Sequence, residues 1–275
     1  MRPTLPTPTA GRPLAEVIAR LARHDAVDGL LLIGSTGREL LNPASDYDLV
    51  LVLNRAPLPL RVALTYIDGR LADIIFVDAA ELAAFTGDQP AAGSVVWGEA
   101  ALARWLRGGT IAYDNTGRLA TAQAAARTRP PEPTDEGGRF SAWFSINYNL
   151  RQNLRMAASG DETYLTALDI RLLYCLSDCW WHYFLLRGLP ERGEKAQVRY
   201  LEAHDPPYLA LFRRCLAEGN RERRFALYRE LAGLTVAPAG GLWADDATSV
   251  LPETSGAWSP DAPARALAFW EELLG

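Results

Sequence analysis

Three aspartates in the first third of the chain have the types and the spacing that chemistry through oxygen ligands needs. Asp46 and Asp48 are separated by one residue ahead of an apolar run at residues 49–53, so on an extended chain both carboxylates project to the same side. Asp73 lies inside a second apolar run at residues 71–77, where an ionised side chain needs a partner or a metal ion. Brought together, these carboxylates are predicted to hold one or two hard divalent cations.

A glycine-containing turn precedes the two aspartates. Gly34 and Ser35 follow an apolar run at residues 29–33, so backbone N–H groups and the Ser35 hydroxyl are expected to face outward as a phosphate cradle. Arg38 adds a positive charge close by. A phosphate cradle, convergent carboxylates and a basic residue are the parts that metal-assisted phosphoryl or nucleotidyl transfer requires.

The elements that must position these residues are predicted from hydrophobic periodicity. Short continuous apolar runs bounded by turn residues indicate buried strands, and Asp68-Gly69 indicates a tight hairpin turn between two of them. Helical spacing recurs between the strands. The first half is therefore predicted to be α/β, with strands at residues 29–33, 49–53, 62–67, 71–77 and 110–113 and helices at residues 14–21, 79–85 and 99–106.

The second half lacks the strand signal. Residues 127–138 hold three prolines and few apolar side chains, so we expect neither a helix nor a central strand there and place a domain boundary between residues 1–129 and residues 138–275. Beyond it, apolar residues recur at helical spacing. The expected fold class is α+β, a mixed sheet with flanking helices followed by an all-α bundle, whose helices lie at residues 140–157, 163–186, 195–202, 207–217, 221–234 and 264–274.

Composition excludes several classes of protein. The 275 residues are 49% apolar and carry a net charge of −5, which supplies a core and argues against a general nucleic-acid coat. Three cysteines are too few for a disulfide scaffold. The N-terminus lacks the order of a signal peptide, and the most apolar stretch, residues 172–186, is too short for a membrane span. We expect a cytoplasmic protein without a membrane partner.

The order Gly34-Ser35, Asp46-x-Asp48 and a later Asp73 within a strand resembles the signature of the DNA polymerase β-type nucleotidyltransferase superfamily. The helical second half is similar in layout to that of the antibiotic nucleotidyltransferases, such as the kanamycin and streptomycin enzymes. The resemblance implies a catalytic first domain and a substrate-binding helical domain. It implies that Asp46 and Asp48 bind Mg²⁺ on the triphosphate, that Ser35 contacts the phosphates, and that Asp73 completes the metal site or deprotonates the acceptor.

The resulting functional hypothesis is Mg²⁺-dependent transfer of a nucleoside monophosphate, with ATP as the first donor to consider, to a hydroxyl of a small molecule such as an aminoglycoside-like antibiotic. Lys195 is a second candidate for contacting the triphosphate, and a solvated first-turn residue is an equally good interpretation. Asp73, Asp178 and Glu99 all stand as candidates for the general base.

Two alternatives remain at this point. The first is transfer to a protein or RNA acceptor, supported only by an arginine cluster between Arg213 and Arg229, although glutamates interleaved with these arginines favour pairing within the protein. The second is a nucleotide-binding regulatory module without turnover, which has little use for three mutually repelling carboxylates.

Overall fold

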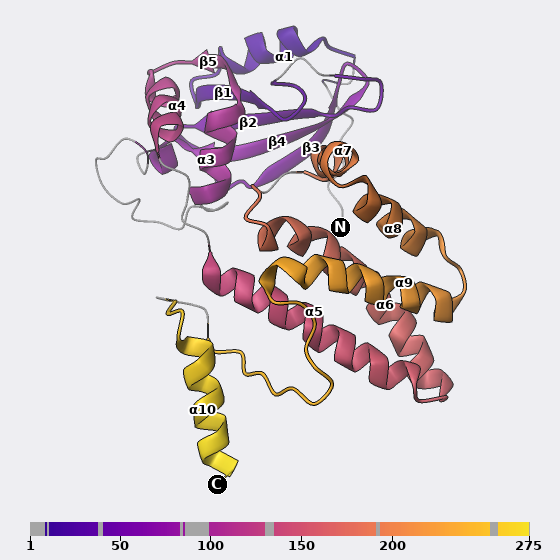
Figure 1. Cartoon of the computed structure of the whole chain (residues 1–275). Coiled ribbons are helices and arrows are strands. Elements are labelled where there is room, and N and C mark those ends of the chain that lie inside the picture. Colours follow the sequence, from indigo (N-terminus) through magenta and orange to yellow (C-terminus); the bar gives the residue numbers. More distant parts are fainter. Residues whose placement is uncertain are drawn as a thin grey trace. The chain divides into compact units, whose positions relative to one another are not determined.

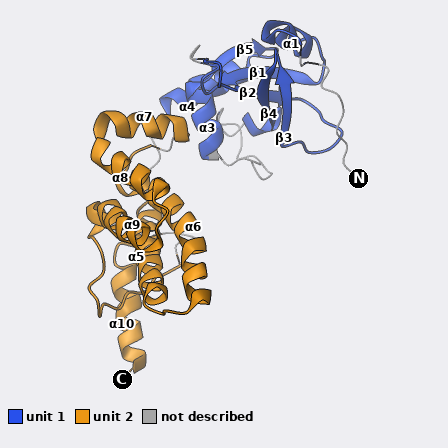
Figure 2. Cartoon of the chain, turned by 90° about the vertical axis from the view of Figure 1, so that its right-hand side faces the viewer, with its two compact units in different colours: residues 1–131 blue, residues 132–275 orange. Residues whose placement is uncertain are grey.

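The computed structural model of the chain describes residues 9, 11–37, 41–82, 85, 99–129, 135–190, 193–253 and 258–274. It divides into two compact units, residues 1–131 and residues 132–275 (Figure 2). The division falls within the proline-containing stretch at residues 127–138.

The first unit is built on a mixed sheet, which confirms the predicted α+β class (Figure 1). In the described residues its strand order is β3-β4-β2-β1-β5. Strands β2 and β4 are parallel, and the other neighbouring pairs are antiparallel. The bounds are β1 (Val27–Ile33), β2 (Tyr47–Leu53), β3 (Val62–Ile67), β4 (Arg70–Asp78) and β5 (Thr110–Asp114).

Helices cover both faces of this sheet, which explains why its central strands are continuously apolar. On one face α1 (Leu14–Leu21) contributes Val17 to a core with Leu30 and Leu49. On the other face Leu31 and Val50 belong to a second core. That core is completed by buried residues of the 3-10 helix η1 (Ala79–Leu82), α3 (Glu99–Gly108) and α4 (Arg118–Thr128).

Two local predictions in this unit are corrected. Of the helix predicted at residues 79–85, Ala79–Leu82 form a 3-10 helix and residue 85 is α-helical, while residues 83 and 84 lie outside the described residues. Helix α4, which the sequence analysis did not predict, includes residues 127 and 128 of the stretch expected to be non-helical. Its buried side chains are mostly small, so its core-facing stripe at Leu119, Ala122, Gln123 and Ala126 carries little apolar signal.

The second unit is a helical bundle, as predicted. Asp135 caps α5, so this helix begins within the stretch that we expected to be non-helical. Asp161, Asp205 and Asn220 cap α6, α8 and α9 in the same way. The helices are α5 (Glu136–Ala157), α6 (Glu162–Leu186), α7 (Glu194–His204), α8 (Pro206–Ala217), α9 (Arg221–Val236) and α10 (Ala262–Leu274), with a 3-10 helix η2 (Ala237–Ala239) after α9.

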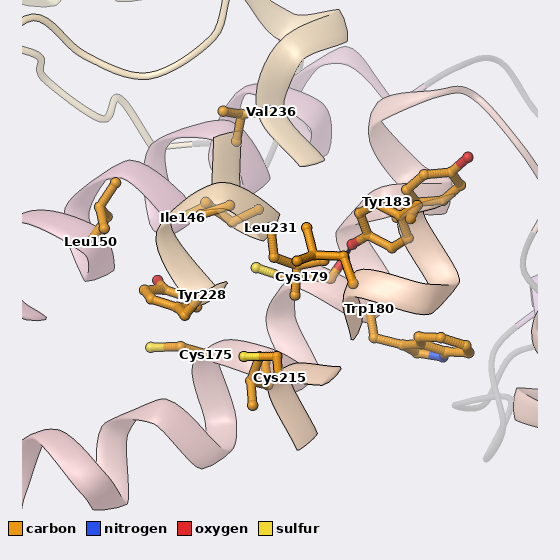
Figure 3. Packing of buried hydrophobic residues seen from close by; sticks show 14 of the residues in the cluster. Ile146, Leu150, Cys175, Cys179, Trp180, Tyr183, Cys215, Tyr228, Leu231 and Val236 are labelled. Atoms are coloured by element: carbon orange, nitrogen blue, oxygen red, sulfur yellow. Dashed lines mark hydrogen bonds between the residues drawn. The ribbon is translucent and has the colours of Figure 1, made fainter. Parts of the chain in front are cut away.

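The core of the second unit holds all three cysteines. Cys175, Cys179 and Cys215 are buried as free thiols, close to Tyr228 and Leu231 (Figure 3). Burial raises the pKa of all three thiols. The cysteines therefore act as small apolar packing residues.

Within the described residues, no helix combines the length and apolarity needed to cross a membrane.

Candidate metal centre

The register between β2 and β4 brings the three aspartates together. Asp48 on β2 pairs with Asp73 on β4 in the parallel ladder. Asp46 lies two residues before Asp48, so it projects to the same side of the strand. One carboxylate oxygen from each residue lies within 4.8 Å of the others, and all three residues are partly buried. This meeting follows from the parallel pairing of β2 and β4, whereas the hairpin turn at Asp68-Gly69 joins β3 to β4.

Three carboxylates at this separation repel one another when ionised. A divalent cation relieves that repulsion, and several carboxylate oxygens around one point are the donor set that Mg²⁺ and Mn²⁺ favour. The residues at this position therefore fit a hard divalent cation.

A turn at residues 34–37 packs against the cluster. Gly34 has φ +60°, a left-handed conformation that glycine adopts without steric cost. A Cβ atom at this position would collide with Oδ2 of Asp48. A Cβ atom at Gly37 would likewise collide with the carbonyl oxygen of Leu32. Both glycines are required because the turn lies so close to β1 and to the carboxylate of Asp48.

Thr36 connects this turn to the aspartates and was missed by the sequence analysis. Its buried hydroxyl accepts a hydrogen bond from the backbone N–H of Asp48 at 3.0 Å and lies 3.5 Å from the carbonyl oxygen of Asp46, to which it donates. Ser35 in the same turn is partly buried. The signal available in the sequence was a second hydroxyl between the two glycines, and only the fold shows that it faces inward.

Arg70 holds the loop that leads into Asp46. Its guanidinium donates to the carbonyl oxygens of Asn42 and Ser45, and it lies 5.8 Å from the ring centre of Tyr47. Ser45 Oγ accepts from the backbone N–H of Asn42 at 3.0 Å, which closes the turn. Arg70 is therefore a positioning residue for the cluster, and its place at the start of β4 gave no sign of this in the sequence.

The remaining predicted site residues are distributed as follows. Arg38 lies outside the described residues. Glu99 begins α3, and its side chain also lies outside what is described. Lys195 is exposed in the first turn of α7, and Asp178 lies on α6, so both belong to the helical unit. Among the candidate bases, the structure places Asp73 in the acidic cluster.

Asp178 is partly buried on α6. Burial raises its pKa, an effect opposed by the nearby His182. Asn149 lies between Asp178 and Arg171 and bonds both side chains. The Asn149 amide donates to Asp178 at 3.3 Å, and Arg171 donates to the oxygen of that amide at 2.8 Å. Asp178 therefore lies at the end of a polar network that joins α5 to α6.

The chain is similar in structure to a nucleotidyltransferase-like protein from Exiguobacterium sibiricum. The two are 15% identical, and the TM-score is 0.40. The match covers 82% of this chain and 75% of the other chain. Neither a protein-family model nor a curated protein matches the chain. A likeness at this level does not assign a function.

Proposed function

We propose that the chain is a divalent-metal-dependent nucleotidyltransferase that moves a nucleoside monophosphate from a nucleoside triphosphate to a hydroxyl group of a small molecule. The convergence of Asp46, Asp48 and Asp73 next to a glycine turn carries this proposal. The geometry supplies a place for a hard cation and, beside it, backbone and hydroxyl groups suited to phosphate oxygens.

Each residue has a distinct role in this proposal. Asp46 and Asp48 hold the cation, and Ser35 with the backbone of its turn contacts the triphosphate. Bound Mg²⁺ supplies positive charge that neutralises the triphosphate and the departing pyrophosphate. Asp73 either completes the metal site or takes the proton of the attacking hydroxyl. A bond forms between the acceptor oxygen and the α-phosphorus, the bond to the β-phosphate oxygen breaks, and pyrophosphate leaves.

We place the acceptor among small molecules because four of the six arginines between Arg213 and Arg229 are paired within the protein. Arg213 bonds Glu202, and Arg223 bonds Glu218. Arg221 and Arg224 both bond Asp169. Pairing neutralises much of the positive charge that phosphate recognition on RNA needs. The net charge of −5 favours cationic acceptors, so aminoglycosides are the first class to test.

The test uses the full chain with Mg²⁺, labelled nucleoside triphosphates and a panel of hydroxyl acceptors. We expect release of pyrophosphate and a labelled product, with ATP as the first donor. Asp46→Asn/Asp48→Asn should lower the rate by a factor on the order of a thousand or more, because the charges that stabilise the transition state are lost. Folding of this double variant, followed by circular dichroism, should change little. Undiminished turnover would exclude the assigned roles of the two residues.

A further inference from the structure

The outer face of strand β3 is apolar where an exposed edge strand is usually polar. Val62, Leu64 and Tyr66 alternate along the strand with exposed fractions of 53%, 68% and 49%. Ala63 and Ile67 face the other side of the sheet, where they join the core under α1. We call Val62, Leu64 and Tyr66 the β3 row.

The register of the sheet places the β3 row beside the acidic cluster. Leu64 pairs with Asp73 in the antiparallel ladder, and residues directly opposite in such a ladder share a face with Cβ atoms roughly 5 Å apart. Val62 and Tyr66 pair with Ile75 and Leu71, so they are the diagonal neighbours of Asp73 at roughly 7–8 Å. All three side chains therefore lie on the same sheet face as the candidate catalytic carboxylate.

The row has the dimensions of a small apolar ligand. From Val62 to Tyr66 the strand advances by roughly 13 Å, taking about 3.3 Å for each residue. Leu71, which is 37% exposed, widens the surface next to Tyr66. Single exposed apolar residues are common on protein surfaces, but a contiguous row beside a polar site is typical of a ligand-binding surface.

We propose that the β3 row binds an apolar segment of the acceptor, so that the acceptor is an amphiphilic alcohol whose reacting hydroxyl lies at Asp73. This inference rests on the proposed function and narrows its substrate class. The acidic cluster sets the position of the hydroxyl, and the row lies on the neighbouring strand with its middle residue, Leu64, opposite Asp73. An amphiphilic ligand that lies there buries its own apolar surface and that of the β3 row, whereas a purely polar polycation does not.

The experiment compares acceptors that share one head group and differ only in the apolar part. Methyl and octyl β-glucoside, the latter kept below its micelle concentration, are offered to the full chain, with kanamycin as a polar polycation. Saturation-transfer NMR measures binding without turnover, and labelled-nucleotide transfer measures reaction. We expect octyl glucoside to bind and react better than methyl glucoside.

Leu64→Ser should weaken octyl glucoside binding about tenfold, the loss that follows when one leucine-sized apolar contact is not made. Leu173→Ser is the matched control, because Leu173 is 69% exposed on α6 and belongs to the helical unit. This control should leave the binding unchanged. Equal effects of the two substitutions would overturn the assignment of the row, as would equal binding of the two glucosides.

The outcomes separate this inference from the proposed function. Metal-dependent transfer to kanamycin and methyl glucoside that equals transfer to octyl glucoside would overturn the inference and leave nucleotidyl transfer standing. Octyl glucoside binding that depends on Leu64, with no transfer to any acceptor, would support the row and contradict the proposed function. A chain that sediments as a dimer, and as a monomer after Leu64→Ser, would show that a second copy covers the row and would overturn the inference.

Discussion

Gly34→Ala tests whether the turn at residues 34–37 sets the position of the Asp48 carboxylate. Gly34 has φ +60°, so an alanine there costs about 1–2 kcal/mol of folding free energy from the left-handed backbone alone. In addition, its Cβ collides with Oδ2 of Asp48, so that the carboxylate must move out of the cluster. Gly69 provides the control. It has φ +70°, and among the described residues no atom lies within 4 Å of a Cβ placed there.

Both substitutions should therefore lower the free energy of unfolding by a similar amount, about 1–2 kcal/mol, measured by urea denaturation. Only Gly34→Ala should also lower the rate of pyrophosphate release, by about a hundredfold, because a displacement of roughly 1 Å at a reacting centre has that effect. Gly69→Ala should retain the rate of the unmodified chain, since its backbone lies in the hairpin turn between β3 and β4.

The reasoning is refuted if Gly34→Ala and Gly69→Ala have the same rate of pyrophosphate release. Equal rates would mean that Asp48 tolerates the added methyl group without leaving a productive position. A loss of activity in both variants would mean that the sheet as a whole, and not the contact with Asp48, controls the rate.

Three further substitutions test positioning and stability. Thr36→Val removes the hydroxyl bonded to the Asp48 backbone and should reduce pyrophosphate release 10- to 100-fold, roughly, whereas Thr36→Ser keeps the hydroxyl and the activity. Asp28 is 1% exposed and accepts a hydrogen bond from the Thr116 hydroxyl at 3.0 Å. Asp28→Ala should therefore lower the free energy of unfolding, measured with urea, by about 3 kcal/mol. The control Asp25→Ala, at an exposed position, should lower it by less than about 0.5 kcal/mol. Burial lowers the pKa of His182 from 6.5. At low pH the unfolded chain therefore binds a proton that the folded chain does not, so free energy of unfolding is lost as the pH falls below about 6.5. His182→Gln should remove that loss between about pH 7.5 and about pH 5.5, while substitution of the exposed His24 should not.

Much of the fold could be predicted because its elements carry strong local signals. The continuous apolar runs at residues 29–33 and 49–53 form β1 and β2, and Asp68-Gly69 forms the hairpin turn between β3 and β4. Helix α4 could not be recognised because its buried stripe consists largely of alanine and a glutamine. Gln123 is buried for a polar reason that only the fold reveals, since its amide donates to the carbonyl oxygens of Leu106 and Gly109.

The acidic residues of the candidate site could be identified from the sequence, but the residues that position them could not. Asp46, Asp48 and Asp73 were identified because carboxylates in or beside apolar strands need an explanation. Thr36 and Arg70 were missed because their roles depend on hydrogen bonds to backbone atoms distant in sequence. Such contacts follow from strand register and loop conformation, which the pattern of residue types does not encode.

Binding of Mn²⁺ to the full chain, followed by isothermal titration calorimetry, tests most directly whether the three aspartates form a metal centre. The account predicts saturable binding to the unmodified chain and its loss in Asp46→Asn/Asp48→Asn, because the carboxylate oxygens that meet within 4.8 Å are the ligands. Identical titrations of the unmodified chain and the double variant would contradict it.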